Sequence, residues 1–135
     1  MIFTIKRAVF ILLLLLSLLS LPPAVHSAEL SPAIRTEIEH LLSHMEKSGC
    51  EFYRNGTWYK DPKAVREHVE TKYRYFMNKG LINSTEDFIK WSATKSELSG
   101  KPYLVKCGDG QEQPLSQWLM DELNRSRKGK AADSR

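Results

Sequence analysis

The stretch Cys50–Lys60, Cys-Glu-Phe-Tyr-Arg-Asn-Gly-Thr-Trp-Tyr-Lys, decides the fold of this chain. Its Asn-Gly pair at 55–56 lies between residues that favour β-strands, and both central positions of a tight hairpin turn need a positive φ, which these two residues tolerate. A two-residue turn places Tyr53 opposite Trp58, so that the two rings share one face of the hairpin. Phe52 then lies on the other face. The sequence therefore predicts an antiparallel hairpin with an aromatic pair that points outward.

Helical patterns surround this hairpin, and one further strand follows. Apolar residues recur with helical spacing in four segments, 31–49, 61–80, 84–100 and 114–124. Alternating residues predict a strand over 101–107, and a loop is expected over 108–113. Together these patterns predict an α+β fold in which four helices pack on a small antiparallel sheet, made of the hairpin plus one further strand.

The length and charge of the chain limit the classes of protein to which it can belong. It has 135 residues, of which 20 are Lys or Arg and 16 are Asp or Glu. This is enough for one compact domain, and too little for a TIM barrel. Residues 28–124 hold 13 basic and 15 acidic side chains, so this domain lacks the basic surface of a nucleic-acid binder. The basic tail at 125–135 is expected to be solvated and disordered.

Residues 1–27 have the layout of a secretory signal peptide. Lys6 and Arg7 precede an apolar run over 8–21, and prolines and small residues follow this run. We expect cleavage after Ser27 and export to the periplasm or the cell exterior, with membrane contact only through the leader before cleavage. An uncleaved leader that serves as a membrane anchor is the alternative.

The chain has two cysteines, Cys50 and Cys107. In an oxidising compartment such a pair is more often a disulfide than a metal site, and no Cys-x-x-Cys motif is present. Strand alternation places Cys50 on the side of Phe52, and Cys107 on the side of Val105, so both cysteines fall among inward-facing residues. We therefore expect a disulfide between them, with two buried free thiols as the alternative.

Three segments, 52–56, 84–89 and 99–106, resemble in order and spacing the YfeK-like family of small exported bacterial proteins, also described as domain of unknown function 5329. The resemblance spans roughly residues 30–125, nearly the whole chain after the leader. It implies a bacterial periplasmic protein with one α+β domain. It implies no substrate, cofactor or catalytic residue.

Two groupings of polar residues could carry chemistry, and both are interpreted as ordinary surface. His40 and His44 stand four apart on the first predicted helix, but the Glu that follows the first His in a metalloprotease helix is missing. Ser92 and Lys95 stand three apart, as a nucleophile and its base can, yet this spacing is common and such a site needs a larger domain. We therefore expect no catalytic residue, no metal and no cofactor.

The candidate binding residues are Tyr53, Arg54, Trp58 and Lys101. The first three belong to the hairpin, whose outward rings are typical of a docking surface unless a helix covers them. Lys101 lies at a helix-to-strand junction, where backbone N–H groups can hold an anion or simply end the helix. The sequence thus favours a non-catalytic module that binds another protein or an envelope glycan. A small envelope enzyme with an unrecognised active site is the alternative.

Overall fold

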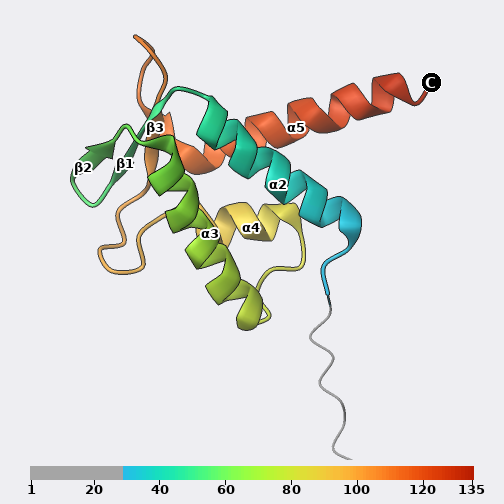
Figure 1. The fold of residues 1–135 in the computed structure, drawn as a ribbon, viewed down its shortest axis with the longest axis horizontal. Helices are drawn as coiled ribbons and strands as arrows, with labels where there is room; N and C mark the ends of the chain where they lie inside the picture. The colour runs from blue at the N-terminus through green and yellow to red at the C-terminus, as the bar shows by residue number, and fades with distance from the viewer. Residues whose placement is uncertain (1–28) are drawn as a thin grey trace, which may run out of the picture.

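The computed structural model describes residues 29–135, and the predicted leader at 1–27 lies outside this range. The described chain has four helices and one four-stranded antiparallel sheet, which confirms the predicted α+β fold class. The sheet lies at one end of the molecule and the helices extend away from it (Figure 1). None of the helices in this range is long and apolar enough to cross a membrane. The elements are α2 Pro32–Lys47, β1 Glu51–Arg54, β2 Thr57–Tyr59, α3 Pro62–Asn78, α4 Thr85–Ser92, β3 Leu104–Lys106, β4 Gln113–Pro114 and α5 Leu115–Asp133.

The hairpin of β1 and β2 pairs in the predicted register. Tyr53 lies opposite Trp58, and Asn55 and Gly56 form the turn with φ values of 50° and 90°. The predicted further strand, β3, pairs with the other edge of β1, and the strand order is β2-β1-β3-β4. The two-residue β4 is an addition to the prediction, because two residues carry no detectable alternation.

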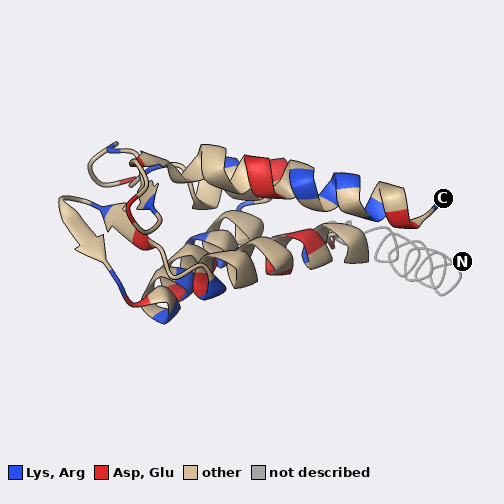
Figure 2. Ribbon diagram, turned by 90° about the horizontal axis from the view of Figure 1, so that it is seen from above, with Lys and Arg blue, Asp and Glu red and all other residues tan. Residues whose placement is uncertain are grey.

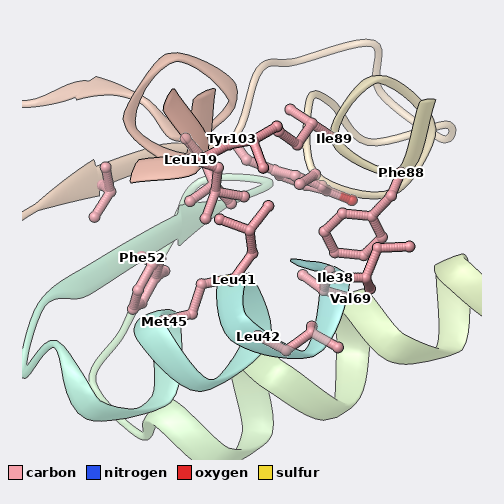
Figure 3. Close-up of a cluster of buried hydrophobic side chains, with 14 of the residues drawn as sticks. Ile38, Leu41, Leu42, Met45, Phe52, Val69, Phe88, Ile89, Tyr103 and Leu119 are labelled. Atoms are coloured by element: carbon pink, nitrogen blue, oxygen red, sulfur yellow. The ribbon is translucent and has the colours of Figure 1, made fainter. Parts of the chain in front are cut away.

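The helices and the inner face of the sheet share one hydrophobic core (Figure 3). Phe52 and Val105 contribute from β1 and β3, and Leu119 contributes from α5. Figure 3 also shows Leu41 of α2 and Val69 of α3 in this cluster. Each fully buried apolar side chain of this size stabilises the fold by about 1.5–3 kcal/mol. The core therefore forces the opposite face of the sheet to point outward.

α4 is shorter than the helix predicted over 84–100. It ends at Ser92, and the carbonyl of Ile89 in its last turn accepts from both the N–H of Ala93 and the hydroxyl of Thr94. The chain then turns towards β3, where the N–H of Tyr103 donates to the carbonyl of Thr94 at 2.9 Å. The predicted C-terminal end of this helix was wrong because the carbonyl of Thr94 accepts its hydrogen bond from Tyr103 and not from an N–H of a further helical turn.

The segment 125–135, expected to be disordered, is helical as far as Asp133. Its Arg127 donates to Glu37 of α2 and to Glu86 of α4. Figure 2 shows the basic residues of this part of α5, which follow acidic residues in the preceding turns. Ion pairs with two other helices thus order a segment whose composition alone is typical of a solvated tail.

A disulfide joins Cys50 to Cys107, as predicted. Cys50 is buried, whereas Cys107 is exposed and not inward-facing, because β3 ends at Lys106 and the chain turns at Gly108 with a φ of 57°. The bond ties the residue before β1 to the residue after β3. It therefore closes the central strand pair of the sheet at one end.

Candidate functional site

The outer face of the sheet carries the aromatic pair that the hairpin pattern predicts. The ring centroids of Tyr53 and Trp58 lie 5.4 Å apart, and both side chains are half-buried. Lys106 of β3 places its Nζ 5.0 Å from the centroid of the Trp58 ring. Both rings lie outside the hydrophobic core, which covers the other face of the sheet. The pair therefore remains at the surface of the molecule.

Charged side chains surround this aromatic pair. The Nζ of Lys60 lies 3.1 Å from one oxygen of Glu51, and the Nζ of Lys106 lies 3.7 Å from the other. Two amino groups thus share one carboxylate, which leaves a net positive charge. We call Glu51, Tyr53, Trp58, Lys60 and Lys106 the outer-face patch.

The other two candidate binding residues lie away from this patch. Arg54 points to the opposite face of the hairpin, where its guanidinium lies 5.0 Å from the centroid of the Tyr59 ring and donates to the Tyr59 hydroxyl at 3.3 Å. Lys101 is exposed, after a turn in which Ser99 donates its hydroxyl to the side-chain oxygen of Asn55 at 2.6 Å. The structure thus brings two of the four predicted residues together.

A cleft opens on the Arg54 side, between α3, the hairpin and the loop before β3. It consists of an inner cavity of about 100 Å³ and an outer cavity of about 410 Å³, and Arg54, His68 and Tyr103 line both. Apolar side chains form most of the remaining wall, including Phe52, Val65, Val69, Tyr75, Phe76 and Leu98. We call these two adjoining cavities the α3 cleft.

Hydrogen bonds join the polar groups of the α3 cleft. His68 Nε2 lies 3.1 Å from the Tyr103 hydroxyl oxygen, and Lys72 Nζ donates to the same oxygen at 3.4 Å. Lys72 also donates to the carbonyl of Lys95 at 2.6 Å, and its Nζ lies 3.8 Å from the carboxylate of Glu97. Two side chains of α3 therefore hold the Tyr103 hydroxyl between the two cavities.

Burial and positive charge shift the proton affinities in the α3 cleft. Burial, reinforced by the charges of Arg54 and Lys72, lowers the pKa of His68 to about 4. Burial also lowers the pKa of Lys72, against the opposing effect of Glu97. The pKa of Tyr103 is raised, mainly by burial. At neutral pH His68 is therefore uncharged and Tyr103 keeps its proton.

The two histidines interpreted as surface residues converge on Glu122, a buried residue of α5. Its side chain is 5% exposed, and its carboxylate oxygens lie 2.6 Å from His40 Nε2 and 3.9 Å from His44 Nε2. Burial raises the pKa of Glu122, but hydrogen bonds from His40 and Arg125 outweigh it and the pKa is lowered. The carboxylate is thus already paired, and within residues 29–135 no three His, Cys, Asp or Glu side chains are arranged to hold a metal ion.

Sequence reasoning named Arg54 but missed Glu122 and the other polar residues of the α3 cleft, His68, Lys72 and Tyr103, although weak signals existed. Glu122 lies beside Leu119 and Leu123 on the apolar stripe of α5, and a carboxylate at such a position indicates a buried ion pair. His68 and Lys72 stand four apart on α3, which places them on one helix face. Neither signal shows which distant residue completes the contact.

The spacing of Ser92 and Lys95 does not produce a pair on one helix. α4 ends at Ser92, whose hydroxyl is buried and has no hydrogen-bond partner within the described chain. Lys95 lies beyond the helix, in an isolated β-bridge with Pro102. The two side chains are therefore not aligned on a helix surface as a nucleophile and its base would be.

Residues 32–127 match the model of a family described as a family of unknown function, DUF5329. The matched segment contains both the outer-face patch and the α3 cleft. Comparison with curated proteins and with solved structures gave no match. On the strength of the family match, which covers most of its length, this chain belongs to the DUF5329 family of unknown function.

Proposed function

We propose that this protein is an exported bacterial binding domain of the YfeK-like type, without catalytic activity, that docks on an acidic glycan of the cell envelope. Export is supported by the leader-like layout of residues 1–27. It is also supported by the disulfide between Cys50 and Cys107, because such bonds persist in oxidising compartments.

The outer-face patch is the observation that carries this proposal. Tyr53 and Trp58 remain at the surface because the core occupies the other face of the sheet. The face of an aromatic ring is electron-rich, and the C–H groups of a sugar ring pack favourably against it. An apolar surface rimmed by charged side chains is typical of an interaction site.

The charge and the size of the outer-face patch indicate which kind of partner it binds. Lys60 and Lys106 share the single carboxylate of Glu51, so the patch attracts a partner with acidic groups. A stable protein interface needs about 20–30 residues a side. The outer-face patch has five residues, four on strands of three or four residues each and Lys60 directly after β2, which suits a sugar better than a protein.

A binding role is preferred to catalysis because His40 and His68 are paired with other side chains and Ser92 is buried. His40 bonds to Glu122, and His68 bonds to Tyr103. The hydroxyl of Ser92 is buried. A nucleophile must reach both its base and the substrate, and these contacts provide neither.

Sedimentation with an insoluble, carboxylate-bearing envelope glycan tests the proposal. The purified processed protein should pellet with the glycan, and Trp58→Ala should weaken binding at least about tenfold. Leu81→Ala is the matched control, because it removes an apolar side chain that is exposed elsewhere, after α3. Unchanged glycan binding by a folded Trp58→Ala protein would refute the glycan proposal. Capture of a protein partner that Trp58→Ala abolishes would instead support a protein interface.

Cell fractionation tests the export part of the proposal separately. The protein should be found outside the cytoplasm, without residues 1–27 and with no titratable thiol at Cys50 or Cys107. Recovery of the protein from the cytoplasm with both thiols free would overturn the export part of the proposal.

A further inference from the structure

The α3 cleft is a second site on the other side of the hairpin, and it shares only Tyr53, which also lines the inner cavity, with the outer-face patch. The Trp58 ring lies on the outer face of the hairpin, whereas Arg54 lies in the cleft on the other side. We infer that the α3 cleft binds a small acid with an apolar body, such as a medium-chain fatty acid, and that Arg54 and Lys72 hold its acid group. This inference stands independently of the glycan proposal.

The size and walls of the cleft suit an apolar body. The outer cavity, at about 410 Å³, falls within the range of small-molecule sites, about 300–1,000 Å³. Two large apolar side chains on its lining stay in water, because Leu98 is 95% exposed and Tyr75 is 55% exposed. A bound apolar chain that covered them would be stabilised, because their apolar surface would leave water.

The cationic side chains of the cleft are incompletely neutralised. The Nζ of Lys72 lies 3.8 Å from the carboxylate of Glu97, which is 54% exposed and so contributes a weak pair that a ligand can replace. The guanidinium of Arg54 rests against Tyr59, and no carboxylate within residues 29–135 forms an ion pair with it. The cleft thus has two cationic side chains, Arg54 and Lys72, against the single carboxylate of Glu97, which favours a ligand that carries a negative charge.

The proton affinity of His68 supports the same conclusion. Burial is the largest cause that lowers the pKa of His68, and the positive charges of Arg54 and Lys72 are the next two causes. A field that disfavours a proton on His68 favours an anion in the same place. The Tyr103 hydroxyl, which lies between His68 and Lys72, adds a donor that can rotate towards an acid group.

Titration with three ligands of equal chain length tests the inference. Octanoate, octanol and octylamine share an eight-carbon chain and differ in the charge of the head group. Octanoate should bind and shift the amide signals of His68 and Lys72 in NMR spectra, octanol should bind at least about tenfold more weakly, and octylamine should bind least. Equal affinity for octanol and octanoate, or no binding of octanoate, would overturn the inference. Binding to vesicles of anionic lipid without binding of octanoate would overturn it as well, in favour of a membrane surface.

Two variants assign the role of the cations. Arg54→Gln and Lys72→Met should each weaken octanoate binding about tenfold while octanol binding stays unchanged. Lys128→Gln, which removes an exposed positive charge on α5, is the matched control. If a variant does not fold, added salt on the unaltered protein must still weaken octanoate binding but not octanol binding, and equal effects on both would overturn the inference. Octanoate binding that persists where glycan sedimentation fails would refute the proposed function alone.

Discussion

Arg127 joins the last part of α5 to two other helices, and its removal should measurably destabilise the protein. Its Nε and Nη2 each donate to one oxygen of Glu37 at 2.8 Å, and its Nη1 donates to Glu86 at 2.5 Å. Two parallel bonds from arginine to a carboxylate form the strongest ordinary ion-pair geometry. Arg127→Ala therefore breaks the ion pairs that join the last part of α5 to α2 and α4, and leaves the contact between His40 and Glu122 in place.

The magnitude follows from the pKa of Glu37. The hydrogen bond from Arg127 is the largest cause that lowers this pKa from 4.5 to about 2. A difference of that size corresponds to a ceiling of about 3 kcal/mol. The Glu37 side chain is 15% exposed and the Arg127 side chain 41% exposed, so water screens part of the interaction. We therefore expect Arg127→Ala to lower the free energy of unfolding by about 1–2 kcal/mol at neutral pH.

The pH dependence has a definite sign. Because the folded pKa of Glu37 lies below its unfolded value, the ion pair contributes fully above about pH 4.5 and loses its contribution as the pH falls towards 2. The stability difference between the unaltered protein and Arg127→Ala should therefore be constant from neutral pH down to about 4.5. It should narrow progressively below that pH.

Urea denaturation followed by circular dichroism at several pH values measures this difference. Lys128→Ala is the matched control, since it removes the same charge from the neighbouring, exposed position of α5. On a Glu37→Gln background, Arg127→Ala should cost less than in the unaltered protein. A loss below about 0.5 kcal/mol at neutral pH, or a loss equal to that of Lys128→Ala, would refute the reasoning.

The disulfide, the core and the buried carboxylate allow three more predictions. Replacing both Cys50 and Cys107 by Ser should lower the free energy of unfolding by about 4 kcal/mol, the chain-entropy value for a separation of 57 positions. Urea midpoints of the two proteins check this, and equal midpoints would contradict it. Leu119→Ala removes a side chain with no exposed surface and should cost about 2–5 kcal/mol by calorimetry; a loss below about 1 kcal/mol would show that this side chain is not packed in the core. Glu122→Gln keeps the side-chain size but removes the charge that bonds to His40, at an expected cost of about 1–3 kcal/mol. Because the pKa of Glu122 is lowered, that cost should be largest above pH 4.5 and shrink as the pH falls, and a cost independent of pH would exclude this origin.

The features that could be predicted from the sequence depend on contacts between near neighbours. The turn at Asn55 and Gly56 needs positive φ at both positions, which few other residue pairs accept, and the register of the hairpin follows from it. The start of α4 is equally local, because the Ser84 hydroxyl accepts a hydrogen bond from the N–H of Asp87 at 3.0 Å. Such signals are complete within three or four residues.

The candidate sites could be predicted only in part, because the sequence pattern shows contacts between near neighbours and not contacts between distant elements. Alternation along β1 and β2 places Tyr53 and Trp58 on one face, and the structure confirms this placement. The same alternation places Arg54 on the other face, but it does not show that α3 brings His68 and Lys72 to that side. The cleft between them forms only when the helix packs against the sheet.

The amino-acid sequence by itself therefore determined the hairpin, the helix starts and the disulfide, because short-range sterics, capping and the presence of only two cysteines leave few alternatives. Tertiary structure alone decided that α5 continues past Arg125, that His40 meets Glu122, and that a cationic cleft opens beside Tyr103. Each of these depends on charged or polar side chains far apart in the chain. Their meeting is set by how the helices pack on the core, and no local periodicity records that packing.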